Sequence, residues 1–270
     1  RLQQEQAHRL RHQHRVLAAA RTHLLERNAC SNAAMLARIA RRGARPARCL
    51  STRPANQKAV EDMRSNYTKG SLDESNAGDD PLRLFQRWFD KAVAAKLLEP
   101  NAVTLSTVDA ATMQPSSRVV LLKGFDESGF TFYTNYAGRK ARELAATPKA
   151  AMNVLWLPLE RQVRIEGTIA KVGAAETEAY FRSRPRASQI GAWASRQSAV
   201  VGSAAELSDR EAELERRFEG RDVPLPDFWG GYRLRPTMIE FWQGKQSRLH
   251  DRIAFRAADA GAWTRERLAP

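Results

Sequence analysis

Three polar side chains alternate along a short apolar stretch near the C-terminus. Residues 248–255 read RLHDRIAF, so on a strand Arg248, His250 and Arg252 would project from one face. Successive members of this row would lie about 7 Å apart. Like charges at this separation repel unless an anion or an electron-rich ring lies between them. A phosphorylated ligand fits this row, and a solvated sheet face balanced by nearby carboxylates fits it equally well.

A second set of cations surrounds apolar strands. Residues 118–125 read RVVLLKGF, and the four consecutive apolar residues predict a strand buried on both faces, with Arg118 and Lys123 at a cavity rim. Farther along, Arg139 and Lys140 follow a strand and open a helix. Backbone N–H groups and the helix dipole favour phosphate at such a position. An arginine–lysine pair at a helix start is also common on a solvated surface.

A third cluster combines two hydroxyls with a guanidinium. Tyr180, Arg184 and Ser188 recur at intervals of four in the segment YFRSRPRASQ, residues 180–189. They share one helical face if the helix continues through Pro185. Such a face predicts a phosphate clamp, although many helices without a ligand show the same spacing.

Short β-like runs dominate the rest of the chain. Asp80 and Pro81 predict the start of a helix that runs to about Leu98. Further helices are expected at 139–146, 174–182 and 208–219, the last with a capping box formed by Ser208 and Glu211. Strands are expected at 102–108, 118–125, 130–134, 151–157, 162–172, 238–242, 249–255 and 263–268. A small β-barrel with peripheral helices fits this order better than a dinucleotide-binding domain.

Charge is distributed unevenly along the 270 residues. The formal net charge is +14, but residues 1–60 hold 13 Lys and Arg against 2 Asp and Glu, and the remainder holds 31 against 28. The basicity therefore belongs to the N-terminal segment and argues against nucleic acid or a membrane as partner of the body. Cys30 and Cys49 both lie in that segment, which excludes a cysteine nucleophile or zinc cluster from residues 61–270. No apolar run approaches the roughly 20 residues that span a bilayer.

The basic extension, residues 1–60, is expected to precede a single domain at 61–270. Residues 1–34 come before the first methionine, Met35, and we expect them to lie upstream of the natural start. Residues 35–54 are rich in Arg and Ala and lack acidic residues, as in a mitochondrial transit peptide, and Arg48–Ser51 resembles a matrix-protease cleavage site. This predicts a mitochondrial location. The alternative is a disordered basic tail on a cytoplasmic protein.

Together these stretches resemble the pyridoxine (pyridoxamine) 5′-phosphate oxidase family. The likeness covers about residues 60–270 in order, and a match of this length is highly specific. Only the turn at Ala111–Met113, one residue longer than usual, departs from the pattern. The matching segments are MRSNYTKG (63–70), RVVLLKGF (118–125), FYTNYAGRKARE (132–143), ERQVRIEG (160–167), YFRSRPRASQIGAW (180–193), RQS (196–198), PDFWGGYR (226–233), EFWQG (240–244), RLHDR (248–252) and ERLAP (266–270).

The resemblance implies an α+β fold that is mainly β with peripheral helices, an FMN-binding split β-barrel. It also implies a homodimer with FMN at the subunit interface and no metal. The implied FMN contacts are Arg118, Val119, Val120, Leu121, Tyr133, Thr134, Arg139, Lys140, Gln162, Gln197, Ser198, Trp242 and Arg252. The implied substrate contacts are Arg64, Tyr67, Lys123, Tyr180, Arg184, Ser188, Arg248, Leu249 and His250, with Arg248 and His250 as the catalytic residues.

The implied reaction oxidises the 4′-alcohol or 4′-amine of a vitamin B6 phosphate to pyridoxal 5′-phosphate. O₂ would be the acceptor and H₂O₂ the by-product. Arg139 and Lys140 would take the FMN phosphate, and Lys123, Tyr180, Arg184 and Ser188 the substrate phosphate. His250 would orient the substrate or help to remove its proton. A related flavoprotein that reduces a different substrate would be expected to lack at least one of the four clamp residues, and all four are present.

Overall fold

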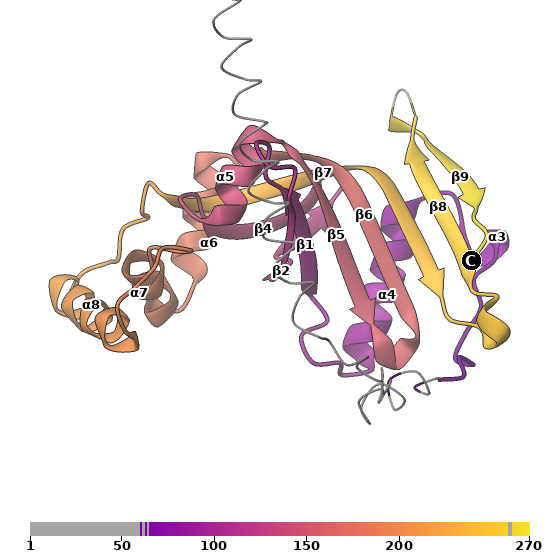
Figure 1. Ribbon diagram of the computed structural model, residues 1–270, viewed down its shortest axis with the longest axis horizontal. Helices are drawn as coiled ribbons and strands as arrows, with labels where there is room; N and C mark the ends of the chain where they lie inside the picture. Colours follow the sequence, from indigo (N-terminus) through magenta and orange to yellow (C-terminus); the bar gives the residue numbers. More distant parts are fainter. Residues whose placement is uncertain (1–59, 61–62, 64, 259–260) are drawn as a thin grey trace, which may run out of the picture. The chain divides into compact units, whose positions relative to one another are not determined.

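The computed structural model describes residues 60, 63, 65–258 and 261–270, and Ser65–Pro270 forms one compact unit (Figure 1). Residues 1–59, with the predicted targeting segment, and the predicted substrate residue Arg64 lie outside the described residues. Its strands are β1 (Ala102–Val108), β2 (Pro115–Leu121), β3 (Gly124–Asp126), β4 (Gly129–Asn135), β5 (Lys149–Trp156), β6 (Arg161–Lys171), β7 (Trp229–Gln243), β8 (Asp251–Ala257) and β9 (Trp263–Arg267). Its helices are α3 (Glu74–Ala77), α4 (Pro81–Ala94), α5 (Arg139–Ala146), α6 (Ala174–Ser183), α7 (Arg186–Ala194) and α8 (Ala204–Arg217), with 3₁₀ turns η1 (Leu157–Leu159) and η2 (Gln246–Arg248).

The strands form one antiparallel sheet in the order β2-β1-β5-β6-β7-β4-β3, and β8 pairs with β7 and β9. Along one edge, strand β7 pairs with β4 as far as Leu234 and with β8 from Met238 onward. Pro236, which has no N–H to donate, lies between the two pairings opposite Gly167. A Cβ on Gly167 would come within 2.0 Å of the Arg235 carbonyl oxygen, so only glycine fits this bend. The sheet is therefore split where β7 changes its partner.

Aromatic side chains fill the space between α4 and the sheet. Asp80 caps α4 by accepting from the N–H groups of Leu82 and Arg83, so the predicted start at Pro81 is confirmed. Phe85 packs edge-on against Phe130 with ring centroids 5.1 Å apart, and Trp88 packs against Phe241 at 5.2 Å. The helix ends at Ala94, before the predicted Leu98, because the backbone leaves the helical region and reaches a φ of 53° at Lys96.

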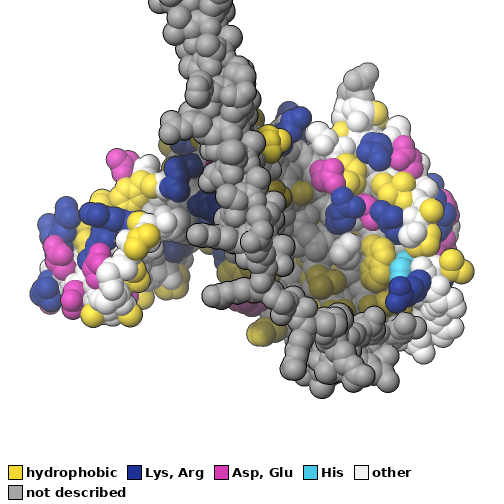
Figure 2. Space-filling model, in the orientation of Figure 1, with side chains coloured by type: hydrophobic (Ala, Val, Ile, Leu, Met, Phe, Trp, Pro, Cys, Tyr) yellow, Lys and Arg dark blue, Asp and Glu magenta, His cyan; other side chains and the backbone are white. Residues whose placement is uncertain are grey.

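A second, smaller core joins α6, α7 and α8 to the start of β7. Its buried side chains include Phe181, Ile190, Leu214 and Trp229. Figure 1 shows these helices beyond the end of the sheet at which β7 begins. Basic and acidic side chains intermix over α7 and α8 (Figure 2), in keeping with the balanced charge outside the N-terminal extension.

Three local predictions were wrong. Helix α8 begins at Ala204 with Ser203 as its cap, so Ser208 lies inside the helix and makes no capping box. Strand β2 is an edge strand, and Val119 is 64% exposed instead of buried on both faces. Strand β7 begins at Trp229, well before residue 238. Glycine weakens a strand prediction, but Gly230 and Gly231 are required here because Cβ atoms would collide with Tyr136 and Tyr133.

None of the helices in the described ranges is both long and apolar enough to cross a membrane.

Candidate functional site

A cavity of about 640 Å³ opens between the end of β2, strand β4 and helices α5 to α7. Three cations, Lys123, Lys140 and Arg184, line it, and none of the described residues in its wall is acidic. Such a cavity favours anionic ligands. Its other lining residues are Val119, Val120, Leu121, Tyr133, Thr134, Asn135, Tyr180, Pro185, Ser188, Gly191, Ala192, Ser195, Gln197 and Trp229.

Lys140 is a buried ammonium in the first turn of α5. Its Nζ donates to Thr134 Oγ1 at 3.1 Å and to Gln197 Oε1, both neutral oxygens. No carboxylate of the described residues lies within ion-pair distance of it. Burial, with a smaller contribution from the Arg118 charge, lowers the pKa of Lys140 below its usual value. A buried cation without a counter-ion is costly, and an anion in the cavity would relieve that cost.

Arg184 occupies the break between two helices. Helix α6 ends at Ser183 and α7 begins at Arg186, so the helix does not continue through Pro185, and the condition for a single helical face is not met. Pro185 enforces this break because the residue before a proline avoids helical angles, and Arg184 is extended with ψ 147°. Tyr180, Arg184 and Ser188 nevertheless line the same cavity, and Gln189 of α7 holds the break by donating to the carbonyls of Phe181 and Arg184.

The Arg184 side chain is held by aromatic contacts. Its guanidinium lies 4.6 Å from the ring centroid of Trp229. Trp229 in turn stacks on Tyr133, whose ring lies 3.9 Å from that of Tyr180. Nη1 of Arg184 is buried and has no hydrogen-bond partner among the described residues. An orphaned buried donor on a cavity wall indicates an anionic ligand.

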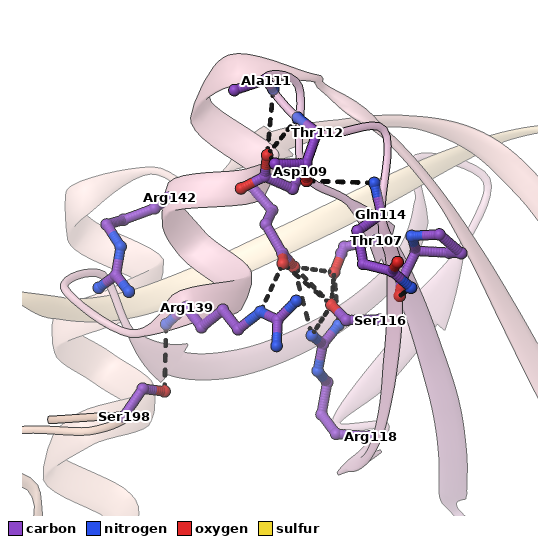
Figure 3. Close-up of polar contacts among 12 residues, drawn as sticks. Thr107, Asp109, Ala111, Thr112, Gln114, Ser116, Arg118, Arg139, Arg142 and Ser198 are labelled. Atoms are coloured by element: carbon purple, nitrogen blue, oxygen red, sulfur yellow. Dashed lines mark hydrogen bonds and ion pairs between the residues drawn. The ribbon is translucent and has the colours of Figure 1, made fainter. Parts of the chain in front are cut away.

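Glu143 connects two of the arginines expected among the FMN contacts, Arg118 and Arg139. Its buried carboxylate accepts from Arg139 Nε at 2.7 Å and from Arg118 Nη2 at 3.3 Å (Figure 3). Burial alone would raise the pKa of Glu143, but hydrogen bonds from Thr107, Ser116 and Arg139 outweigh it and hold the pKa at about 2. Arg139 also anchors Ser198, whose Oγ accepts from the Arg139 backbone N–H at 3.1 Å. Arg118, Arg139 and Ser198 thus border the cavity without lining it.

A second group of predicted residues lies on β6, β7 and β8. Gln162, Trp242 and Arg252 are direct partners across the three strands and therefore share one face of the sheet. Arg252 Nε donates to the buried Glu240 at 2.8 Å, and this hydrogen bond raises the pKa of Arg252. Tyr67 packs edge-on against Trp242, with ring centroids 5.6 Å apart.

The predicted strand through Arg248 and His250 was wrong. Strand β8 begins at Asp251, and Gln246–Arg248 forms the turn η2, with φ of 56° at Ser247 and 61° at Arg248. Of Arg248, His250 and Arg252, only Arg252 therefore lies on a strand. The His250 ring instead lies 4.6 Å from Trp242 and 5.6 Å from Tyr67. Leu249, expected at the substrate, is 68% exposed.

Within one chain the predicted residues therefore form two groups. Val119–Leu121 and Lys140 belong to the cavity, whereas Tyr67, Trp242 and His250 do not line it. In the hydrogen-bonded order, β1, β5 and β6 lie between β2 and β7.

Sequence reasoning missed several residues at both places. Trp229, Asn135, Pro185, Gly191, Ala192 and Ser195 line the cavity without carrying an obvious chemical signal. Glu143 had one usable signal, its position four residues after Arg139 on a helix. Glu240 had none, because its pairing with Arg252 depends on the register of β7 and β8. Among the described residues no group of His, Cys, Asp and Glu could hold a metal ion.

A curled antiparallel sheet with peripheral helices defines this protein as a split β-barrel, which confirms the predicted fold class. Residues 89–217 match the family described as pyridoxamine 5′-phosphate oxidase. Residues 229–270 match the pyridoxine 5′-phosphate oxidase C-terminal dimerisation region. The chain belongs to the pyridoxine/pyridoxamine 5′-phosphate oxidase family, as the resemblance in its motifs predicted.

Proteins named pyridoxine/pyridoxamine 5′-phosphate oxidase support this assignment. The one from Rubrobacter xylanophilus is 56% identical over 208 residues, which are 77% of this chain and 95% of that protein. The one from Pseudomonas paraeruginosa is 56% identical over 214 residues, which are 78% of this chain and 99% of that protein. Both relatives are bacterial and give no support to the predicted mitochondrial location.

Two solved structures share the fold. PhzG from Burkholderia lata, in complex with tetrahydrophenazine-1-carboxylic acid, has a TM-score of 0.68 and 30% identity, covering 74% of this chain and all of that one. An FMN-binding, pyridoxamine 5′-phosphate oxidase-related protein from Nostoc punctiforme has a TM-score of 0.56, covering 69% of this chain and 97% of that one. At 14% identity, the second likeness concerns the fold alone.

Proposed function

We propose that this protein oxidises pyridoxine 5′-phosphate and pyridoxamine 5′-phosphate to pyridoxal 5′-phosphate, with FMN as cofactor and O₂ as acceptor. The observation that carries this proposal is the cavity with Lys123, Lys140 and Arg184 and no acidic residue in its described wall. Both the cofactor and the substrates carry a phosphate, so one cationic cavity suits the two ligands. The 56% identity to oxidases of these substrates supports the same function.

The residues present fit FMN. Lys140, buried with only neutral partners, and the neighbouring Arg139 would hold its phosphate, with the Arg118 charge close behind them, and Ser198 and Gln197 would add polar contacts. Val119, Val120, Leu121, Tyr133 and Thr134, which all line the cavity, would contact the flavin. When bound, FMN would supply the redox chemistry, accepting a hydride from C4′ while the hydroxyl or amine gives up a proton, and O₂ would take the two electrons and two protons and leave as H₂O₂. With pyridoxamine 5′-phosphate the resulting imine would be hydrolysed by water to the aldehyde, releasing ammonia.

The substrate phosphate would be held by Lys123, Tyr180, Arg184 and Ser188. Arg184 brings a buried Nη1 that has no partner among the described residues, and a phosphate oxygen would satisfy it. Tyr180 and Ser188 add hydroxyl donors from the two helices that flank the break at Pro185. Fixing the phosphate at this end would orient the pyridine ring for transfer from C4′.

The second group of residues would complete the site from another subunit. Trp242, Arg248, His250 and Arg252 all lie in the segment that matches the family's dimerisation region, residues 229–270. We infer a homodimer in which this group on one subunit faces the cavity of the other, with FMN between them. Tyr67, Gln162 and Leu249 would enter the site with the same group.

A different substrate is the second candidate, because PhzG, which shares the fold with a TM-score of 0.68, was solved in complex with a phenazine carboxylic acid. A carboxylate could also pair with Arg184. The presence of all four clamp residues favours phosphate.

Anaerobic titration tests the proposal. FMN-loaded protein should lose its oxidised flavin absorbance when pyridoxine 5′-phosphate or pyridoxamine 5′-phosphate is added, because the substrate reduces the flavin. Pyridoxine without a phosphate, at the same concentration, should leave the spectrum unchanged. A flavin that stays oxidised with both phosphates would contradict the proposed function.

The mitochondrial location stays a prediction from residues 35–54 and is separate from the activity. A fusion that starts at Met35 should enter mitochondria, and a diffuse cytosolic signal would contradict the prediction.

A further inference from the structure

Glu143 is a nearly inaccessible carboxylate, 4% exposed, on the inner face of α5. Four side chains from three elements donate to it. Ser116 Oγ on β2 lies 2.8 Å from Oε2, and the hydroxyl of Thr107 on β1 also donates to Oε2. Arg139 Nε lies 2.7 Å from Oε1, and Arg118 Nη2 lies 3.3 Å from Oε2. Figure 3 draws these contacts as dashed lines that meet between the labelled Ser116, Arg118 and Arg139.

The network fixes the two guanidinium groups differently. Arg118 directs Nη1 to the Leu105 carbonyl and to Thr107, and Nη2 to Ser116 and Glu143, so its plane is set by four acceptors. Arg139 uses only Nε for Glu143, and its side chain is 52% exposed. Its two terminal nitrogens make no hydrogen bond to any described residue. Glu143 therefore fixes the Arg139 guanidinium through Nε, and the two terminal nitrogens stay available for a ligand.

Arg118 and Arg139 are each adjacent in the sequence to residues that line the cavity. Arg118 directly precedes Val119–Leu121, and Arg139 directly precedes Lys140, and both of those neighbours line the cavity. The start of α5 lies beside Gln197 and Ser198, and a Cβ at Gly138 would come within 2.6 Å of Gln197 Oε1. The Glu143 network thus lies next to the part of the cavity wall that Lys140 forms.

We propose that Glu143 is a positioning residue for the FMN phosphate: it holds Arg139, whose terminal nitrogens have no described partner, in the orientation that binds phosphate beside Lys140, and Arg118 braces the carboxylate from behind. Glu143 thereby contributes to the preference for FMN over flavins without a phosphate. This inference rests on the proposed function, because it requires FMN to occupy the cavity with its phosphate at the start of α5.

A purely electrostatic role for Glu143 predicts the opposite sign. A carboxylate near a phosphate repels it, so removing the charge alone would strengthen FMN binding. A positioning role predicts weaker FMN binding, because the freed Arg139 guanidinium loses its orientation and pays conformational entropy on binding. The direction of the change in FMN affinity therefore separates the two roles.

The experiment compares FMN with riboflavin, which lacks the phosphate. Dissociation constants of both flavins, from quenching of flavin fluorescence, are measured for the full-length protein, for Glu143→Gln and for the exposed control Glu127→Gln. We expect Glu143→Gln to weaken FMN by about tenfold, the loss of one charge-assisted hydrogen bond, and to change riboflavin less than about twofold. Glu127→Gln should change neither constant. Unchanged or tighter FMN binding, or an equal loss for both flavins, would overturn the inference.

Ser116→Ala gives a second variant in case Glu143→Gln does not fold. It removes one donor to Glu143 and one acceptor of Arg118, and should shift the ratio of the two constants in the same direction by a smaller factor. An unshifted ratio in folded Ser116→Ala would count against the inference. Failure of the unsubstituted protein to bind FMN would overturn the proposed function and this inference together, whereas normal FMN preference in the variants overturns this inference alone.

Discussion

The backbone N–H of Lys245 donates a hydrogen bond of 3.1 Å to Nδ1 of His250. An imidazole nitrogen that accepts a hydrogen bond carries no proton, so neutral His250 is protonated at Nε2. Burial, followed by the nearby Arg248 charge, lowers the pKa of His250 below its ordinary value of 6.5. At neutral pH His250 therefore presents an N–H donor to its surroundings, and we expect it to orient the substrate without acting as a base.

Substitution of His250 by glutamine tests this role. The glutamine amide places a donor near the position of Nε2 but cannot accept a proton. We expect His250→Gln to keep kcat within about tenfold of the unsubstituted protein, because loss of a general base costs about 10²–10⁴-fold. His250→Leu, which lacks any donor, should lose more. A fall of kcat in His250→Gln by three orders of magnitude would assign a base instead.

Gly244 provides the space in which Tyr67 lies. A Cβ at this position would come within 2.7 Å of Tyr67 Cγ. We expect Gly244→Ala to displace the Tyr67 ring from Trp242 and His250 and to raise KM for the B6 phosphates, with a smaller change in FMN affinity. Steady-state kinetics at saturating FMN measure this. Gly173→Ala is the matched control, since no atom lies within 4 Å of its added Cβ, and an equal rise of KM there would refute the steric explanation.

We expect Lys140 to lower the stability of the FMN-free protein and to strengthen FMN binding. Its buried ammonium has no carboxylate partner among the described residues, while Thr134 Oγ1 also donates to Gln197 Oε1 at 3.1 Å and keeps that bond without the lysine. We therefore expect Lys140→Met to raise the melting temperature of the FMN-free protein by about 2–4 °C, if about 1 kcal/mol is recovered, and to weaken FMN binding. The exposed Lys91→Met should change neither quantity. A lower melting temperature in Lys140→Met would show that the ammonium stabilises the fold.

Arg184 should act mainly on substrate affinity. Loss of a hydrogen-bonded charge on the phosphate costs about 1.5–3 kcal/mol, so Arg184→Ala should raise KM for pyridoxine 5′-phosphate by about 10–100-fold. Arg182→Ala, which removes a surface partner of Glu178, should leave KM unchanged. A fall in kcat with an unchanged KM would contradict the clamp.

Protonation of Glu143 should contribute to the loss of stability of the folded protein at low pH. Its pKa lies at about 2 in the folded protein, below the ordinary 4.5, so the carboxylate adds stability above pH 4.5 that is lost as the pH falls toward 2. Melting temperatures of the unsubstituted protein should fall across this window more steeply than those of Glu143→Gln. Parallel curves would mean that other carboxylates set the acid stability.

Sequence signals that act within a few residues correctly predicted the start of a helix. Asp80 and Pro81 mark the start of α4 because a cap and a proline act within a few residues. The turn η2 was missed, since Ser247 and Arg248 adopt positive φ without a side-chain type that favours it. Alternation therefore placed Arg248 and His250 on a strand that begins only at Asp251.

Long-range contacts explain the rest of the differences. Tyr180, Arg184 and Ser188 do meet at one cavity, but through a helix break and not along one helix. Glu143 reaches Thr107 and Ser116 only because β1 and β2 pair in register, with Thr107 opposite Ser116. Most of the predicted site residues came from the family resemblance, and the structure adds the carboxylates and aromatic rings that hold them.

Aerobic turnover of pyridoxine 5′-phosphate by the purified, FMN-loaded protein is the direct measurement of the proposed oxidase activity. We expect pyridoxal 5′-phosphate and H₂O₂ to form in equal amounts, with no product from unphosphorylated pyridoxine at the same concentration. A protein that binds FMN but forms neither product from pyridoxine 5′-phosphate or pyridoxamine 5′-phosphate would contradict it.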